Sequence, residues 1–273
     1  PWDWPWVCSL HVKASPYHGR FGIQFRREQG RLVVMKVVLL QARRRDDPMM
    51  EHEQDCFADA SGLGREDFSF INLVERVPSW TEVMSHHALM VGGAGHYSVA
   101  KLNGGFFKET VDLLEQVVGE RFPTFASCFG FQLLVHALGG RIAADHENSE
   151  VGSFTLELTE AGRQDELFGS LPHRFTAQLG HKDRAVEMPP GVPNLASSPR
   201  SPLQALRVPG TPIWATQFHP ELDERTNRDR YEAYIERYDP QRLGEGASGF
   251  SALPSPETST LLPAFLRLVS GRS

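Results

Sequence analysis

The chain of 273 residues has few cysteines, no long apolar run and no excess of positive charge. Its cysteines are Cys8, Cys56 and Cys128, an odd and sparse set that argues against a disulfide framework. We therefore expect a reducing compartment and predict a cytoplasmic location. No stretch approaches the roughly 20 apolar residues of a membrane span, so no membrane partner is expected. Lysine and arginine are scattered and the net charge is −6, which argues against a nucleic-acid partner.

Hydrophobic residues make up 40% of the chain, an ordinary value for a soluble globular protein. The length suits one sizeable α/β domain or two small ones. Residues 1–34 carry no lasting helical or strand period, whereas Met35 opens an apolar run typical of a first buried strand. We expect the natural domain to begin at Met35, with residues 1–34 as an extension outside the core fold. The tryptophans of this extension could instead pack on the domain as an arm.

Short apolar segments alternate with helical patterns over the first half of the chain. The expected strands are Lys36–Gln41, Phe68–Leu73, His87–Val91 and Phe122–Ala126, and the expected helices are Glu51–Ala60 and Phe106–Val118. This alternation is typical of an α/β protein with a doubly wound, mostly parallel central sheet. Residues 141–212 favour short antiparallel strands that extend one edge of the sheet.

The last third of the chain predicts two helices joined by a linker. Asp223 to Tyr238 is a charged helical segment whose surface is expected to be solvated. Gly244 to Thr258 is rich in Gly, Ser and Pro, as linkers are, and Leu261 to Val269 is an apolar helix. We predict a main domain over residues 35–240, with residues 241–273 as a linker and a helix that packs on it.

Cys128 stands at the centre of the stretch P-T-F-A-S-C-F-G-F-Q, residues 123–132. A buried strand precedes this cysteine, and Gly130 to Leu138 follows as a predicted apolar helix. A cysteine at such a strand-to-helix turn is lifted out of the sheet, and the helix N-terminus favours its thiolate. The N–H of Phe129 would point at a developing oxyanion. Taken alone, however, a cysteine in apolar surroundings is more often an inert core residue.

A second stretch, I-W-A-T-Q-F-H-P-E-L at residues 213–222, favours a nucleophilic Cys128 over an inert core cysteine. Here a predicted short strand leads to His219 and Glu221, which can project to the same side of an extended chain. A cysteine, a histidine that takes its proton and a carboxylate that orients the histidine form a nucleophile–base–orienter set. We therefore predict Cys128, His219 and Glu221 as catalytic residues.

The two stretches together resemble the class I (triad) glutamine amidotransferase family, including stand-alone relatives of the GMP synthase glutaminase domain. The matching segments are A-S-C-F-G-F-Q, Q-F-H-P-E, the glycine-rich turn at 92–95, D-E-L-F-G-S-L-P at 165–172, G-H-K-D at 180–183 and L-A-S-S at 195–198. The resemblance covers residues 35–240 and implies a flavodoxin-like α/β fold with a small antiparallel extension. Ala126 stands where the family usually has Gly, and its methyl group is the smallest side chain that can replace it.

The resemblance implies hydrolysis of the side-chain amide of glutamine through a γ-glutamyl thioester, with release of ammonia. It also implies substrate-binding roles for Gly93, Phe129 and Gln132, the first two through backbone N–H groups that face the oxyanion. This chemistry needs no metal and no organic cofactor. The histidines near the glycine-rich turn, His86, His87 and His96, match no zinc spacing, so no metal site is predicted.

His181 and Asp183 are weaker candidates, because their segment resembles the substrate rim of the family but also reads as a plain surface turn. Three functions remain open from the sequence. The chain is an amidotransferase that supplies ammonia to an acceptor; because no phosphate-binding G-x-x-x-x-G-K-[ST] occurs, the acceptor site is expected on a separate synthase protein or is absent. Alternatively it is a stand-alone hydrolase of another γ-glutamyl amide, or a non-catalytic binding protein on the same fold.

Overall fold

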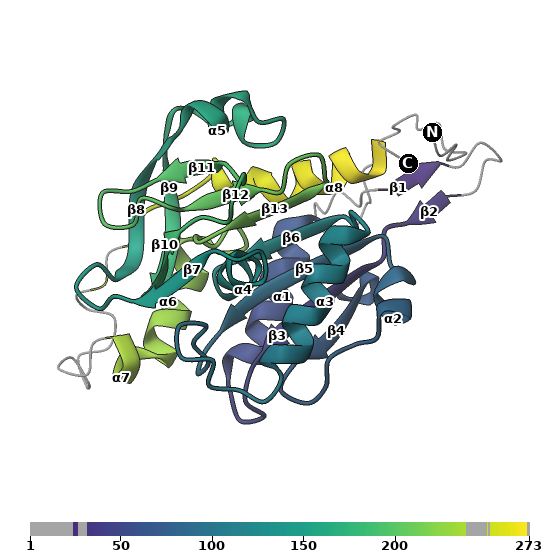
Figure 1. Cartoon of the computed structure of the whole chain (residues 1–273), viewed down its shortest axis with the longest axis horizontal. Helices are drawn as coiled ribbons and strands as arrows, with labels where there is room; N and C mark the ends of the chain where they lie inside the picture. The colour runs from purple at the N-terminus through teal and green to yellow at the C-terminus, as the bar shows by residue number, and fades with distance from the viewer. Residues whose placement is uncertain (1–23, 27–31, 239–249, 251, 272–273) are drawn as a thin grey trace.

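A nine-stranded sheet runs through the molecule in the order β4-β3-β5-β6-β13-β12-β11-β8-β9 (Figure 1). The structure, a computed structural model, describes residues 24–26, 32–238, 250 and 252–271. The parallel strands are β3 (Val37–Ala42), β4 (Phe68–Asn72), β5 (Ala88–Ala94), β6 (Thr124–Ser127) and β13 (Ile213–Thr216). The predicted α/β class with a mostly parallel central sheet is confirmed.

The rest of the sheet is antiparallel and comes from the middle of the chain, as predicted. These strands are β8 (Glu150–Leu158), β9 (Arg174–His181), β11 (Asn194–Ser197) and β12 (Ala205–Arg207). Two small ribbons lie outside it. β1 (Gln24–Arg26) pairs with β2 (Leu32–Val34), and β7 (Arg141–Ala144) pairs with β10 (Asp183–Glu187), a strand that was not predicted. The expectation that the domain begins at Met35 stays a prediction.

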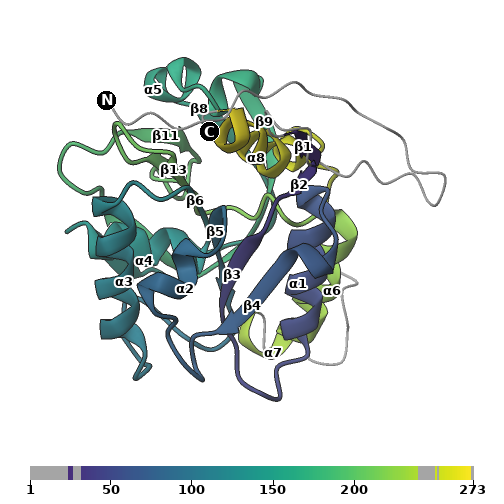
Figure 2. The ribbon, with the colours of Figure 1, turned by 90° about the vertical axis from the view of Figure 1, so that its right-hand side faces the viewer.

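Helices cover both faces of the parallel part of the sheet (Figure 2). Alternate residues of β3 point to opposite faces, so Val37 and Leu39 join one core cluster and Val38 and Leu40 join the other. The first cluster includes residues of α1 (Met49–Ser61) and α8 (Leu261–Gly271). The second cluster lies under α2 (Trp80–Met84), α3 (Phe107–Gly119) and α4 (Phe129–Ala137).

The C-terminal helix α8 packs on the sheet, in agreement with its apolar pattern. Its Phe265 meets the rings of Phe125 and Trp214 edge to face, at centroid distances of 5.7 Å and 6.1 Å. Short helical elements occupy connections: α5 (Glu160–Gln164) and the 3₁₀ turns at 65–67, 168–170 and 258–260. Most of the predicted linker lies outside the described residues.

The charged segment before the linker differs from its prediction. It forms two helices, α6 (Glu224–Ala233) and α7 (Ile235–Tyr238), with the break at Tyr234. The expected solvated face is present on one side of α6, where Arg225, Arg228 and Glu232 are exposed. The other side is buried and carries Asn227, Arg230 and Tyr231. This buried side of α6 faces the cysteine turn described below. Within the described residues, no helix has the length and apolarity needed to cross a membrane.

Candidate active site

Cys128 forms the predicted turn between β6 and α4. Its backbone has φ 50° and ψ −97°, a conformation that non-glycine residues rarely adopt and that costs on the order of 1–3 kcal/mol. Two backbone bonds hold the turn: the Cys128 N–H donates to the Thr216 carbonyl at 2.7 Å, and the Gln132 N–H donates to the Cys128 carbonyl at 3.0 Å. The expected strand-to-helix elbow is therefore present.

Gly130 lets α4 lie close to the neighbouring strand. A methyl group at this position would stand 2.6 Å from the Val91 carbonyl oxygen, closer than atoms can approach. Ala126, in the strand before the elbow, is fully buried among apolar side chains. Its methyl group is part of the core cluster that includes α4, which explains why alanine is tolerated at this position.

His219 and Glu221 lie beyond the end of β13 and form a buried pair. The expected extended strand stops at Thr216, and a turn brings His219 Nδ1 to 2.6 Å from Glu221 Oε1. Ser127, next to the cysteine, donates its hydroxyl to the same carboxylate oxygen at 3.3 Å. The turn therefore places the predicted base and orienter beside the elbow.

Burial shifts the pKa values of Cys128, His219 and Glu221. It raises the pKa of the Cys128 thiol to about 11, against the opposing charge of Arg230. It raises the pKa of the Glu221 carboxyl to about 7. Burial, and then the positive charge of Arg230, lower the pKa of His219 well below its usual value. Burial thus favours the uncharged form of each of these three side chains.

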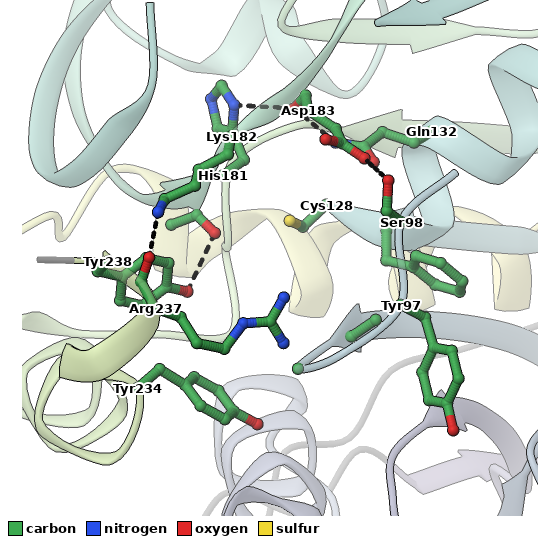
Figure 3. A pocket seen from close by; sticks show the side chains of 14 residues that line it. Tyr97, Ser98, Cys128, Gln132, His181, Lys182, Asp183, Tyr234, Arg237 and Tyr238 are labelled. Atoms are coloured by element: carbon green, nitrogen blue, oxygen red, sulfur yellow. Dashed lines mark hydrogen bonds between the residues drawn. The ribbon is translucent and has the colours of Figure 1, made fainter. Parts of the chain in front are cut away.

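A cavity of about 100 Å³ opens over the cysteine (Figure 3). Of the predicted residues, it is lined by Cys128, Phe129, Gln132, His181 and Asp183, whereas Gly93, His219 and Glu221 do not line it. In Figure 3 the Cys128 sulfur lies between two groups of side chains. Ser98 and Asp183 are on one side, and Tyr234, Arg237 and Tyr238 are on the other. The cavity residues not expected from the sequence include Tyr97, Ser98, Lys182, Tyr234, Arg237 and Tyr238.

The polar side chains in the cavity are held by one another. Gln132 Nε2 donates to the Asp183 carbonyl at 2.8 Å and to Gln217 Oε1 at 3.1 Å. Gln217 Nε2 in turn lies 3.7 Å from Cys128 Sγ. Gln217 therefore links Gln132 to the thiol. The amide nitrogen of Gln132 is already hydrogen-bonded to Asp183 and Gln217.

His181 belongs to a buried cluster behind the cavity. Its Nε2 lies 3.1 Å from Glu150 Oε2, and its Nδ1 lies 3.1 Å from the Asp183 carbonyl oxygen. The reading of this segment as a plain surface turn is wrong, because His181 and Glu150 are buried. In the described part of the chain, no three His, Cys, Asp or Glu side chains are grouped as a metal site would need.

Gly93 is close to the imidazole, but its N–H is engaged. It donates to Glu53 Oε1 at 2.7 Å, and the same carboxylate accepts from Arg43 at 2.9 Å. A methyl group added to Gly93 would lie 3.4 Å from His219 Cε1. In this arrangement the Gly93 N–H bonds a carboxylate of α1 instead of facing a substrate oxygen, which differs from the orientation that the resemblance implies.

Arg230 was missed from the sequence and contacts His219 of the His219–Glu221 pair directly. Its Nη1 lies 2.6 Å from His219 Nε2, the nitrogen opposite the one that meets Glu221. The signal was present in the spacing of Asn227, Arg230, Tyr231 and Tyr234, which is that of one helix face. Because half of this face is polar or charged, hydropathy does not reveal that it is buried.

Comparisons with known proteins identify the family of the chain. The family model "Glutamine amidotransferase class-I" matches residues 72–234. The GMP synthase of Thermosipho melanesiensis is 34% identical over 125 residues, which are 44% of this chain and 23% of that protein. A glutamine-hydrolyzing GMP synthase subunit of Pyrococcus abyssi is 32% identical over 110 residues, 40% of this chain and 56% of that protein. The match thus spans about a quarter of the first relative and just over half of the second.

Solved structures share the fold. A glutamine amidotransferase from Thermotoga maritima superimposes with a TM-score of 0.64 at 20% identity, over 86% of this chain and 98% of that one. Another, from Methylobacillus flagellatus, has a TM-score of 0.60 at 18% identity, over 87% and 90% of the two chains. The family model covers more than half of the chain and confirms the predicted enzyme class. The chain belongs to the class-I glutamine amidotransferase family.

Proposed function

We propose that this chain is a glutaminase that releases ammonia from the side-chain amide of glutamine for transfer to an acceptor. Cys128 is the nucleophile, His219 the general base and acid, and Glu221 the group that orients His219. The observation that carries the proposal is the buried His219–Glu221 pair, 2.6 Å apart, beside a cysteine whose backbone has φ 50°. A strained nucleophile with a base and an orienter is the arrangement that acyl transfer requires.

The proposed reaction has two steps. The Cys128 sulfur attacks the amide carbon while His219 takes the thiol proton, and the N–H of Phe129 stabilises the oxyanion. His219 then gives its proton to the leaving nitrogen, so that ammonia departs and a γ-glutamyl thioester remains. Water, deprotonated by His219, cleaves the thioester to glutamate and restores the thiol. Gly93 is the second oxyanion donor in this proposal, once its N–H is released from Glu53.

The charges around the cavity suit the head group of an amino acid. Arg237 and Lys182 contribute positive charge on one side of the sulfur, and Asp183 contributes negative charge on the other (Figure 3). A free α-carboxylate and a free α-ammonium would meet opposite charges there. Gln132 lies between Asp183 and Cys128 and contributes to substrate binding in this proposal.

The acceptor is proposed to bind to a separate synthase protein. The relative from Pyrococcus abyssi is named as one subunit of a GMP synthase, which supports an arrangement in which more than one chain forms the enzyme. A thiol nucleophile must stay reduced, so the proposed location is the cytoplasm.

Ammonia release from L-glutamine tests the proposal. The wild-type chain should release ammonia, Cys128→Ala should abolish the release, and Cys56→Ala should retain it. Cys56 is a matched control because it is also buried, but lies on α1. A trapped glutamyl adduct on Cys128, located by peptide mass spectrometry, would identify the thioester. Equal release by the wild type and Cys128→Ala would reject the proposal, as would turnover of other γ-glutamyl amides without turnover of glutamine.

A further inference from the structure

Arg230 is a buried cation without a carboxylate partner in the described structure. Its side chain comes from α6 and is 4% exposed. Among the described residues, no Asp or Glu forms an ion pair with it, and its Nε has no hydrogen-bond partner. Burial of a charge without a counter-ion is costly, so such a residue is retained only where it serves a purpose. Its contact with His219 indicates what that purpose is.

The direction of this contact follows from the chemistry of the two groups. A guanidinium in a protein is always protonated and only donates hydrogen bonds. In the contact of 2.6 Å, Arg230 Nη1 is therefore the donor and His219 Nε2 is the acceptor. The other nitrogen, Nδ1, carries the proton that it donates to Glu221 Oε1 at 2.6 Å. His219 is thus neutral, and both of its nitrogens are engaged.

Activation of Cys128 needs the nitrogen that Arg230 occupies. The thiol proton can pass to the imidazole only through the lone pair on Nε2, since Nδ1 already holds a proton. The thiol does not ionise by itself at neutral pH, because burial raises the pKa of Cys128 to about 11 even with Arg230 nearby. The positive charge of Arg230 alone therefore does not ionise the thiol, and Cys128 still needs His219 as its base.

We propose that the hydrogen bond from Arg230 blocks His219 Nε2, so that Cys128 becomes nucleophilic only when Arg230 leaves this nitrogen. We call this blocking contact the latch. This inference rests on the proposed roles of Cys128 and His219. It adds a control step to them: the described arrangement is the closed state of the site.

The oxyanion side of the site is closed from α1, and α6 contacts the residues that hold it. Gly93 N–H donates to Glu53 at 2.7 Å, and Glu53 is held in place by Arg43. The other end of the Arg43 guanidinium contacts the hydroxyl of Tyr234, the residue that ends α6. Tyr234 is also hydrogen-bonded to Asp47 at 2.7 Å. A displacement of α6 would remove Arg230 from His219 and break the contact between Tyr234 and Arg43. Glu53 would keep its bonds to Arg43, so the Gly93 N–H needs a separate movement of Glu53.

The rate at which iodoacetamide alkylates Cys128 reports, without any substrate, how readily the thiol loses its proton. In this reaction the sulfur forms a bond to carbon, iodide leaves, and the thiol proton goes to the base. We compare the wild type with Arg230→Met, which has a similar length and cannot donate a hydrogen bond. Arg225→Met is the control, because Arg225 is an exposed residue of the same helix. Rates at Cys128 are read at pH 7 by peptide mass spectrometry.

Arg230→Met should alkylate at least about 10-fold faster than the wild type, equivalent to one unit of thiol pKa, because the freed Nε2 accepts the thiol proton. This gain is expected to outweigh the loss of the positive charge of Arg230, which lowers the pKa of Cys128. Arg225→Met should match the wild type. Adding His219→Ala to Arg230→Met should remove the gain. An unchanged or slower rate in Arg230→Met would overturn the proposal and identify Arg230 as the counter-ion of the thiolate.

A measurement on the wild-type protein covers the case in which Arg230→Met does not fold. Nitrogen NMR of ¹⁵N-labelled histidine should find His219 as the neutral Nδ1–H tautomer at pH 7. An Nε2–H tautomer, or a protonated ring at pH 7, would overturn the latch.

The ammonia assay separates this inference from the proposed function. Faster alkylation in Arg230→Met without glutamine hydrolysis in any variant would keep the latch and reject the glutaminase. Hydrolysis that depends on Cys128, with equal alkylation rates in the wild type and Arg230→Met, would keep the glutaminase and reject the latch.

Discussion

At the scale of single residues, the site depends on close contacts that only certain side chains permit. Gly130 is the clearest case, because α4 approaches β5 so closely that a Cβ at this position would collide with the backbone of Val91. The elbow that presents Cys128 lies two residues earlier. Packing of the helix and the position of the Cys128 sulfur are therefore determined by the same few atoms.

Gly130→Ala should lower the free energy of unfolding by about 1–3 kcal/mol, because the methyl group would overpack a rigid backbone contact. Gly119→Ala is the matched control: no atom lies within 4 Å of the added methyl group, and alanine favours the helix. Urea titrations followed by circular dichroism measure both. Equal stabilities of Gly130→Ala and the wild type would contradict the described contact.

The buried carboxyl of Glu221 makes stability depend on pH. Its pKa in the folded protein is about 7, above the ordinary value of 4.5, so the folded state holds the proton more tightly than the unfolded state. The stability that this proton contributes is complete below pH 4.5 and is lost as the pH rises to 7. Glutamine at this position has no proton to lose.

The melting temperature of Glu221→Gln, relative to the wild type, should therefore rise between pH 4.5 and pH 8, by an amount that corresponds to about 3 kcal/mol. Differential scanning calorimetry across this range measures the difference. Glu75→Gln, at an exposed carboxylate paired with Arg45, should give a nearly constant difference. A flat difference for Glu221→Gln as well would show that this carboxyl is ionised at low pH.

At the scale of elements, α6 links the surface of the molecule to the site. Its N-terminus is held by Asp223, whose carboxylate accepts from the Thr226 N–H at 2.7 Å, and its buried face carries Arg230 and ends at Tyr234. The sequence predicts this helix from its charge pattern, with an acidic start and a basic interior. It does not predict the buried face, because a polar face that is buried by hydrogen bonds has no hydropathic signal.

Asp223→Ala should cost about 1 kcal/mol, the usual loss for an N-cap, and lower the melting temperature by roughly 2–4 °C. If α6 carries the latch, the same variant should also alkylate faster at Cys128, since fraying of the first turn loosens Arg230. Asp223→Asn retains the capping oxygen and should behave as the wild type in both measurements. Loss of stability without faster alkylation would leave Asp223 with a structural role alone.

At the scale of the whole molecule, the terminal helix α8 completes one face of the sheet. Its buried side chains are Leu261, Leu262, Phe265, Leu266 and Val269. Burial of each contributes on the order of 1.5–3 kcal/mol, and the sum is comparable to the total stability of a domain. The predicted helix packing after residue 240 is thus energetically central to the fold.

Deletion of residues 239–273 should therefore give an insoluble or unfolded chain, because the parallel sheet would expose Phe125 and Trp214. Deletion of residues 1–34 should change the melting temperature little, as expected for an extension outside the core. Soluble yield and thermal melting compare the two. A large drop on removal of residues 1–34 would contradict the predicted start of the domain at Met35.

The sequence by itself determined the local parts: the alternating strands and helices, the cysteine at a strand-to-helix turn and the short segment with His219 and Glu221. These features rest on hydrophobic period, turn residues and short motifs, which act between neighbours along the chain. The resemblance to the amidotransferase family depended on the same local motifs, and the family model bears it out.

Only the tertiary structure decided which distant groups meet at the site. Arg230 reaches His219 across eleven positions of the chain, and Glu53 reaches the Gly93 N–H across forty. Such contacts are set by how α1 and α6 pack beside the carboxyl ends of the strands. Their side chains are polar, so no periodic pattern of apolar residues marks them as buried. For that reason the sequence identified the catalytic candidates, while the structure revealed that His219 and the Gly93 N–H are both held by buried charged side chains.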